Sequence, residues 1–208
     1  MLTPPLDDPE RRALLRLARQ SLQAAARGQP PPAVDAAALP PRLLQPGACF
    51  VTLTVHDGLR GCIGGLEPQA ALYLEVQQRA AQAARHDYRF PPVTPDELPQ
   101  IEVEVSVLTP PQPLPYASPD DLLARLQPRV DGVILRYGQH RATFLPQVWE
   151  RAPEPAVFLS MLCDKLGARP DLWRRERVEV HTYRVEMFAE ADYAEEAAGG
   201  APVSDGAA

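Results

Sequence analysis

The residues most suited to chemistry in this chain form one short segment, Leu59-Arg60-Gly61-Cys62-Ile63-Gly64-Gly65. Glycine allows positive φ values and close backbone approaches, so the segment can bend and direct N–H groups at a bound partner. A guanidinium beside a thiol stabilises the thiolate, and Arg60 stands two residues before Cys62. If the two side chains converge, the pair can supply a nucleophile with a cationic neighbour.

A purely structural interpretation explains the same residues, and the residue types alone favour it. In that interpretation the segment is the end of a strand, with a β-bulge made by Gly61 and Gly64. Cys62 and Ile63 then fill core space, and Arg60 lays its aliphatic stem along the surface with its charge in water. The two interpretations differ in whether the sulfur and the guanidinium face an open surface.

A cysteine nucleophile needs a base, and the histidines of the chain are at positions 56, 86, 140 and 181. We favour His86 as the residue that moves a proton, because it begins a polar loop that also contains Asp87 and Arg89. Arg89 is the candidate for binding an anionic group. The alternative for His86 is the common structural one, in which a histidine at a helix end interacts with the helix dipole.

The spacing of cysteines argues against metals and cofactors. Cys49, Cys62 and Cys163 are widely separated and form no CxxC pair, which disfavours both a disulfide framework and a structural zinc site. The glycine-rich segment matches neither the GxxxxGKS/T phosphate loop nor the GxGxxG dinucleotide fingerprint. We therefore expect no metal and no cofactor, and we interpret Cys163 as a small buried residue of a helix.

The chain of 208 residues is acidic, with a formal net charge of −6 and a pI near 5.3. This balance opposes nucleic-acid binding, where neutralisation of phosphates supplies much of the affinity. Arginines at positions 169, 174, 175 and 177 form a basic cluster, but acidic residues lie among them, so RNA binding is a distant alternative. No segment has the ~20 apolar residues of a membrane span or the pattern of an export signal, and we expect a cytoplasmic protein without membrane contact.

The sequence predicts a β-hairpin that positions Cys62. Residues 48–55 are rich in β-branched and aromatic side chains, and His56-Asp57-Gly58 supplies a turn, so the second strand begins at Leu59.

Two amphipathic helices are also predicted. The first starts with an Asp8-Pro9 cap and runs to Gly28, and the second spans about 69–85, where apolar residues recur at helical spacing.

Residues 101–108 alternate between apolar and polar side chains, which indicates a half-exposed strand of an antiparallel sheet. Further strands are predicted at 133–137, 141–145 and 178–188, and a further helix at 156–166. From about residue 190 the chain is acidic, rich in Ala and Gly and without pattern, so we predict a disordered tail.

Several separated motifs together resemble the AMMECR domain family, and specifically its bacterial members. They are LRGCIGGLEP at 59–68, DYRFPPVTPDELPQIEVEVSVLTPP at 87–111, ATFLPQVWE at 142–150, FLSMLCDKLG at 158–167 and YRVEMF at 183–188. The resemblance covers residues 9–188, between an N-terminal extension (1–8) and the tail (189–208).

The resemblance implies an α+β fold in which an antiparallel sheet is flanked by helices, with two lobes and the LRGCIG motif at the cleft between them. It also implies association with Memo-like proteins, which resemble extradiol-type dioxygenases, and with radical SAM proteins. The family signature falls on Arg60, Gly61, Cys62 and Gly64, on Asp87, Arg89 and Phe90, and on Thr143, Pro146 and Gln147. One departure is Tyr88, where relatives often have a small residue or proline.

Three functions follow, in order of preference. The first is an accessory or adaptor subunit that acts with Memo-like or radical SAM partners through the LRGCIG motif, with Gly61, Gly64, Asp87, Arg89, Thr143 and Gln147 as binding residues. The second is an enzyme that uses Cys62, Arg60 and His86 on a small anionic molecule. RNA binding is the third. For Thr143 and Gln147, hydrogen bonding within a turn is the structural alternative.

Overall fold

The computed structural model describes residues 4–193 of the chain. In this range the protein is α+β and divides into two compact units. The first unit combines residues 4–107 with the segment from Met187 onward, and the second is Leu108–Glu186. Each contains a four-stranded sheet. In the first unit the strand order is β2 (Gly58–Gly64), β1 (Ala48–Val55), β3 (Ile101–Leu108) and β8 (Val185–Ala189), and in the second it is β4 (Gln112–Pro113), β7 (Glu179–Tyr183), β5 (Gly132–Tyr137) and β6 (His140–Phe144). The predicted architecture of antiparallel strands with flanking helices is confirmed.

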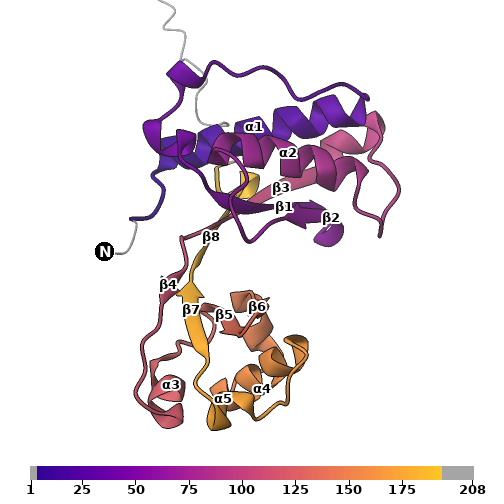
Figure 1. Cartoon of the computed structure of the whole chain (residues 1–208). Helices are drawn as coiled ribbons and strands as arrows, with labels where there is room; N and C mark the ends of the chain where they lie inside the picture. Colours follow the sequence, from indigo (N-terminus) through magenta and orange to yellow (C-terminus); the bar gives the residue numbers. More distant parts are fainter. Residues whose placement is uncertain (1–3, 194–208) are drawn as a thin grey trace, which may run out of the picture. The chain divides into compact units, whose positions relative to one another are not determined.

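Two helices cover one face of the first sheet, as Figure 1 shows. They are α1 (Asp8–Ala26) and α2 (Leu72–Arg85), which lie side by side. A capping box begins α1: the Glu10 N–H donates to Asp7 Oδ1 at 2.8 Å, and the Asp7 N–H donates to Glu10 Oε2 at 3.0 Å. The cap is therefore Asp7, one residue before the predicted one, because the glutamate of a capping box stands three residues after its cap.

Strands β1 (Ala48–Val55) and β2 (Gly58–Gly64) form the predicted hairpin. His56 and Asp57 both have positive φ, at 48° and 62°. This is the conformation of a two-residue type I′ turn, whose twist matches that of the strands it joins.

Strand β3 (Ile101–Leu108) shows the predicted alternation. Val103 and Val105 are completely buried in the core that the helices cover, whereas Glu102 and Glu104 are half-buried. Successive side chains of a strand point to opposite faces, so the glutamates lie on the face that α1 and α2 leave uncovered.

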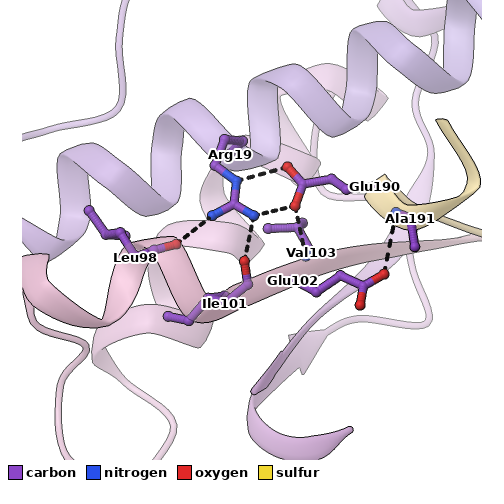
Figure 2. Close-up of polar contacts among 7 residues, drawn as sticks. All are labelled: Arg19, Leu98, Ile101, Glu102, Val103, Glu190 and Ala191. Atoms are coloured by element: carbon purple, nitrogen blue, oxygen red, sulfur yellow. Dashed lines mark hydrogen bonds and ion pairs between the residues drawn. The ribbon is translucent and has the colours of Figure 1, made fainter. Parts of the chain in front are cut away.

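A polar clasp attaches the C-terminal segment to the first unit (Figure 2). The Arg19 guanidinium of α1 forms a two-point ion pair with Glu190, in which Nε donates to Oε1 at 2.8 Å and Nη2 donates to Oε2. The same guanidinium donates to the carbonyls of Leu98 at 3.2 Å and Ile101 at 2.6 Å, and Glu190 Oε2 accepts the Val103 N–H at 3.0 Å. One arginine thus joins α1, the start of β3 and the C-terminal segment.

At both ends, ordered structure extends beyond residues 9–188, the domain limits predicted from the sequence. Glu190 opens a short 3-10 helix, η5 (Glu190–Tyr193), which follows β8 (Val185–Ala189). The tail predicted from residue 190 therefore begins with an ordered turn, and residues 194–208 lie outside the described residues. Within the predicted N-terminal extension, Leu6 is buried and Asp7 caps α1, while residues 1–3 are also outside.

The second unit packs its helices on its own sheet. Its strands are β4 (Gln112–Pro113), β5 (Gly132–Tyr137), β6 (His140–Phe144) and β7 (Glu179–Tyr183), and its helices are α3 (Pro119–Arg125), α4 (Pro155–Lys165) and α5 (Leu172–Arg175). This unit also contains the 3-10 helix η4 (Pro146–Glu150), whereas η1 (Ala36–Ala38), η2 (Pro41–Leu44) and η3 (Pro95–Gln100) belong to the first unit. In the core of this unit Trp149 stacks on Phe158, with ring centroids 3.7 Å apart. Cys163 is completely buried beside them, and burial raises the pKa of its thiol.

The last long strand predicted at 178–188 is wrong in one respect, because it is two strands in two sheets. β7 ends at Tyr183 and β8 begins at Val185. Between them, Arg184 pairs with Thr109 instead: the Arg184 N–H donates to Thr109 Oγ1 and the Thr109 N–H donates to the Arg184 carbonyl, both at 2.9 Å. The chain therefore leaves one sheet and enters the other at Arg184.

Candidate functional site

The Cys62 segment lies in strand β2, as predicted for the second arm of the hairpin, and the sharp bend that its glycines would allow is not adopted. Among the described glycines, only Gly28, Gly138 and Gly167 have positive φ, and Gly61 and Gly64 lie within β2. These two glycines are needed for close packing. A Cβ at Gly61 would lie 2.5 Å from the Ala83 carbonyl oxygen of α2, and one at Gly64 would lie 2.3 Å from the Phe50 ring.

A β-bulge sits at Arg60. Leu53 pairs with Gly61 and Thr54 pairs with Leu59, so Arg60 is the extra residue on its strand. The purely structural interpretation of the sequence is a strand with a β-bulge at Gly61 and Gly64. A bulge is present, but its extra residue is Arg60, one residue before Gly61. Bulges re-aim side chains at strand edges, and this one directs Arg60 toward η3.

The Cys62 thiol lies on the face that α2 does not cover, because the neighbouring Gly61 faces Ala83 of α2. It is half-buried, and the Thr52 hydroxyl opposite it lies 3.3 Å from Sγ. Ile63 packs against the core as expected, but Cys62 does not. The sulfur is thus placed as a surface group rather than as core filler.

The structure places His86 at the end of α2, without a hydrogen bond to the Cys62 thiol. It caps the end of α2, where its N–H donates to the Gln82 carbonyl at 2.7 Å. Its side chain is exposed and lines a groove beside α2 that does not include Cys62. No hydrogen bond joins His86 to Cys62 in the described part of the chain, so the expected cysteine–histidine pair is absent there.

Asp87 and Arg89 instead clip the backbone of Cys62. β2 is an edge strand, and the Cys62 N–H donates to Asp87 Oδ2 at 2.8 Å while Arg89 Nη2 donates to the Cys62 carbonyl at 3.3 Å. Arg89 also donates to both Asp87 oxygens, at 2.9 and 2.6 Å. The clip satisfies both backbone groups of Cys62, so another strand cannot pair with the edge at this residue.

The Asp87 carboxylate is held in its charged form. It is 4% exposed, and burial alone would raise its pKa. The hydrogen bonds from the Arg89 side chain, followed by those from the Cys62 and Arg89 backbone N–H groups, outweigh burial and hold the pKa well below its usual range. The clip is therefore a fixed ion pair at neutral pH.

Arg60 forms a second fixed ion pair. Its Nε donates to Glu97 Oε1 at 2.7 Å and its Nη2 donates to Oε2 at 3.1 Å. Glu97 also completes the capping box of η3, where it accepts the Thr94 N–H at 2.7 Å. Arg60 is the main cause that lowers the pKa of Glu97 to about 2. The third Arg60 nitrogen, Nη1, is buried without a hydrogen-bond partner.

Phe90 links the two ion pairs. Its ring centroid lies 5.9 Å from the Arg60 guanidinium carbon and 5.5 Å from that of Arg89, within the range of cation–π attraction. Glu97 and Thr52 are the members of this cluster that the sequence interpretation did not single out. The signal for Glu97 was present, since Thr94-Pro95-Asp96-Glu97 has the spacing of a capping box.

Thr143 and Gln147 belong to the second unit. Thr143 lies in β6, where its hydroxyl is 3.2 Å from the Tyr183 hydroxyl and its carbonyl accepts from Lys165 Nζ at 2.9 Å. Gln147 is exposed in η4. Tyr183 was not singled out from the sequence. A Cβ at Gly132 would lie only 2.3 Å from the Tyr183 ring, so the absence of a side chain at Gly132 makes room for the tyrosine.

Residues 4–193 contain no group of three or more His, Cys, Asp or Glu side chains arranged to hold a metal ion. In the same range, no helix has both the length and the apolar character needed to cross a bilayer.

Comparisons with known proteins show which family and which relatives this chain is similar to. The sequence profile of the family described as AMMECR1 matches residues 15–188. A protein from Methanothermobacter thermautotrophicus is 39% identical over 187 residues, which cover 89% of this chain and 97% of that protein. A protein from Thermofilum pendens is 39% identical over 162 residues, covering 73% of this chain and 76% of its own. The crystal structure of the uncharacterised protein PH0010 from Pyrococcus horikoshii matches with a TM-score of 0.72 and 32% identity, over 89% of this chain and 93% of that one.

Proposed function

Because this chain belongs to the AMMECR1 family, and because the described residues around Cys62 form ion pairs and include no base that is hydrogen-bonded to its thiol, we propose that it is an accessory subunit that binds a partner protein. The contact region is the Cys62 surface, which we define as Leu59, Cys62, Tyr88 and Arg89. Its backbone is fixed by the Asp87–Arg89 clip, so little ordering is needed when a partner binds.

The exposure of Tyr88 carries this proposal. Tyr88 is 96% exposed although it lies between the two clip residues, and Leu59 is 44% exposed. Tyrosine and arginine are among the residues that contribute most to binding at protein interfaces. A rigid loop that presents a tyrosine and an arginine to solvent suits recognition, whereas a thiol without a base does not suit turnover.

We further propose that the partner is a Memo-like protein or a radical SAM protein. The support is the resemblance of the LRGCIG, DYRFPP and ATFLPQVWE motifs to family members that are associated with such proteins. Titration of the purified chain with one protein of each class, followed by calorimetry, tests both partners directly.

The same titration with variants tests the surface. Tyr88→Ala should weaken binding by at least about tenfold, as for a residue at an interface centre, and Cys62→Ser should stay within about twofold. Tyr137→Ala is the matched control, because Tyr137 is an exposed tyrosine (40%) of the second unit. Loss of binding in Cys62→Ser together with unchanged binding in Tyr88→Ala would contradict the proposal.

One observation favours a second function, an enzyme that uses Cys62 and Arg60 on a small anionic molecule. Nη1 of Arg60 is buried without an acceptor, and an unsatisfied donor of this kind would gain from an anion. Titration with inorganic phosphate, monitored through the side-chain nitrogen resonances of Arg60 by NMR, tests it. A saturable shift that is absent in Arg60→Met supports the enzyme, and no shift removes its support.

A further inference from the structure

A groove of about 860 Å³ lies beside α2 in the first unit, apart from the Cys62 surface. The proline-rich segment 28–34, which follows α1, forms one wall, and residues of α2 form the other. Most of the lining is apolar, and it includes Pro31, Val34, Tyr73, Leu74 and Ala81. This volume lies within the range of small-molecule sites, roughly 300–1,000 Å³.

The proline-rich segment is attached to α2 by a hydrogen bond. Gln77 of α2 is only 5% exposed, and its Nε2 donates to the Pro32 carbonyl at 3.0 Å. Prolines have a fixed φ and no N–H, so the segment 30–32 is stiff and cannot pair as a strand. A buried hydrogen bond and a stiff wall thus form the groove without a ligand.

The charge of the groove is opposite to that of the chain. The chain has 27 acidic and 21 basic residues, yet neither Asp nor Glu lines the groove among the described residues. Arg85 and His86 stand at one end of the lining. The nearby Glu75 is completely buried and is paired with Arg79 at 2.9 Å.

Arg85 has donors available for a ligand. Its Nη1 donates to the Ala25 carbonyl of α1 at 3.0 Å, and within residues 4–193 its other guanidinium nitrogens make no hydrogen bond. An arginine that is anchored through one nitrogen presents the others in a fixed direction, and this geometry matches a planar carboxylate or a phosphate. The apolar lining beside it suits a carboxylate, which carries less charge than a phosphate.

We propose that this groove binds a small carboxylate with an extended alkyl or aryl body. The apolar body lies between the proline-rich wall and Tyr73 and Leu74, and the carboxylate meets Arg85 at the end of α2. The site is separate from the Cys62 surface and does not depend on the accessory function.

The test is an NMR titration of the full chain with three probes: octanoate, 2-naphthoate and 1-octanol. Saturable amide shifts at Leu74, Ala81 and Arg85 should appear with a carboxylate, and 1-octanol should bind about fivefold more weakly than octanoate, as for loss of one exposed charge pair. Octanoate and 2-naphthoate distinguish an alkyl from an aryl site. Shifts from neither carboxylate overturn the proposal, as does equal affinity for octanoate and 1-octanol.

The variant Arg85→Gln and a matched control, Arg27→Gln, test the role of the Arg85 charge, and a second variant, Leu74→Glu, follows below. Arg85→Gln should weaken carboxylate binding about fivefold and leave 1-octanol unchanged. Arg27→Gln is the control, because Arg27 is also an arginine at a helix end that donates to a helix carbonyl, that of Gln23 at 3.2 Å, but does not line the groove.

Leu74→Glu keeps the proposal testable if Arg85→Gln unfolds the helix end. Leu74 is 43% exposed on the groove wall, so a glutamate there is tolerated by folding and repels an anion. Weaker carboxylate binding with unchanged thermal unfolding supports the site. Unchanged carboxylate binding in Leu74→Glu, or an equal loss in Arg27→Gln and Arg85→Gln, contradicts it.

Discussion

The first unit should lose stability in acid because the ion pair between Arg60 and Glu97 is lost when Glu97 becomes protonated. The Glu97→Gln variant measures the contribution of this ion pair. The substitution keeps the size of the side chain and removes its charge. Arg60 first, and then the hydrogen bonds from Thr94, lower the pKa of Glu97 to about 2, and the whole shift relative to an ordinary glutamate corresponds to at most about 3 kcal/mol of folding free energy. Because the Glu97 side chain is 32% exposed, water screens the pair, and we expect about 1–2 kcal/mol.

The pH dependence of this loss has a definite sign. Glu97 has a folded-state pKa below that of the unfolded chain, so its contribution is complete above about pH 5, where both states are ionised. It is lost as the pH falls from about 4.5 toward 2, because the wild-type side chain becomes neutral like glutamine. The difference between wild type and Glu97→Gln should therefore be about 1–2 kcal/mol at pH 7 and should shrink in acid.

The assay must report the correct unit. Trp149 and Trp173 both lie in Leu108–Glu186, so tryptophan fluorescence follows the other unit. Amide hydrogen exchange of β1 and β3, measured by NMR, gives the free energy of opening for the unit that contains Glu97. Glu150→Gln, an exposed residue of the second unit, should change it by less than about 0.5 kcal/mol. A loss that is equal at pH 7 and pH 3.5 would refute the reasoning.

Two further outcomes follow from the same strand. Gly61→Ala should destabilise the first unit by about 1–3 kcal/mol, because its Cβ would lie 2.5 Å from the Ala83 carbonyl oxygen; unchanged denaturant unfolding by far-UV circular dichroism would show that α2 can move away at no cost. Limiting iodoacetamide followed by mass spectrometry should label Cys62 at least about tenfold faster than Cys49 and Cys163, which are completely buried, with the pKa of Cys49 raised by burial to about 12. Equal labelling of the native protein would contradict this accessibility.

Local patterns predicted the elements whose partners are near in sequence. The turn was predicted from His56-Asp57-Gly58, and its two central residues, His56 and Asp57, are types that adopt positive φ more often than most. Strand β3 alternates because one of its faces meets the helices. The break between β7 and β8 could not be seen in the same way. Apolar residues recur on both sides of Arg184, from Val178 to Phe188, and the interruption at Arg184 involves Thr109, which is distant in sequence.

The sequence predicted which residues belong to the candidate site but not which of them contact one another. Asp87 and Arg89 were identified, yet their attachment to the Cys62 backbone depends on where the end of α2 meets the edge of β2. Glu97 carried only the signal of a helix cap, because its pairing with Arg60 joins residues of two separate elements. Glycines at 61 and 64 suggested conformational freedom, whereas contacts with Ala83 and Phe50 are the reason for them.

The discontinuity of the first unit has a consequence for synthesis on the ribosome. Its sheet needs β8 and its clasp needs Glu190, but residues 109–184 are translated between β3 and β8. Arg19 therefore waits for its partner until the 170 residues between it and Glu190 have been made. The intervening unit is continuous and can fold while the nascent chain is still tethered, so of the two units the one whose synthesis starts earlier is completed later.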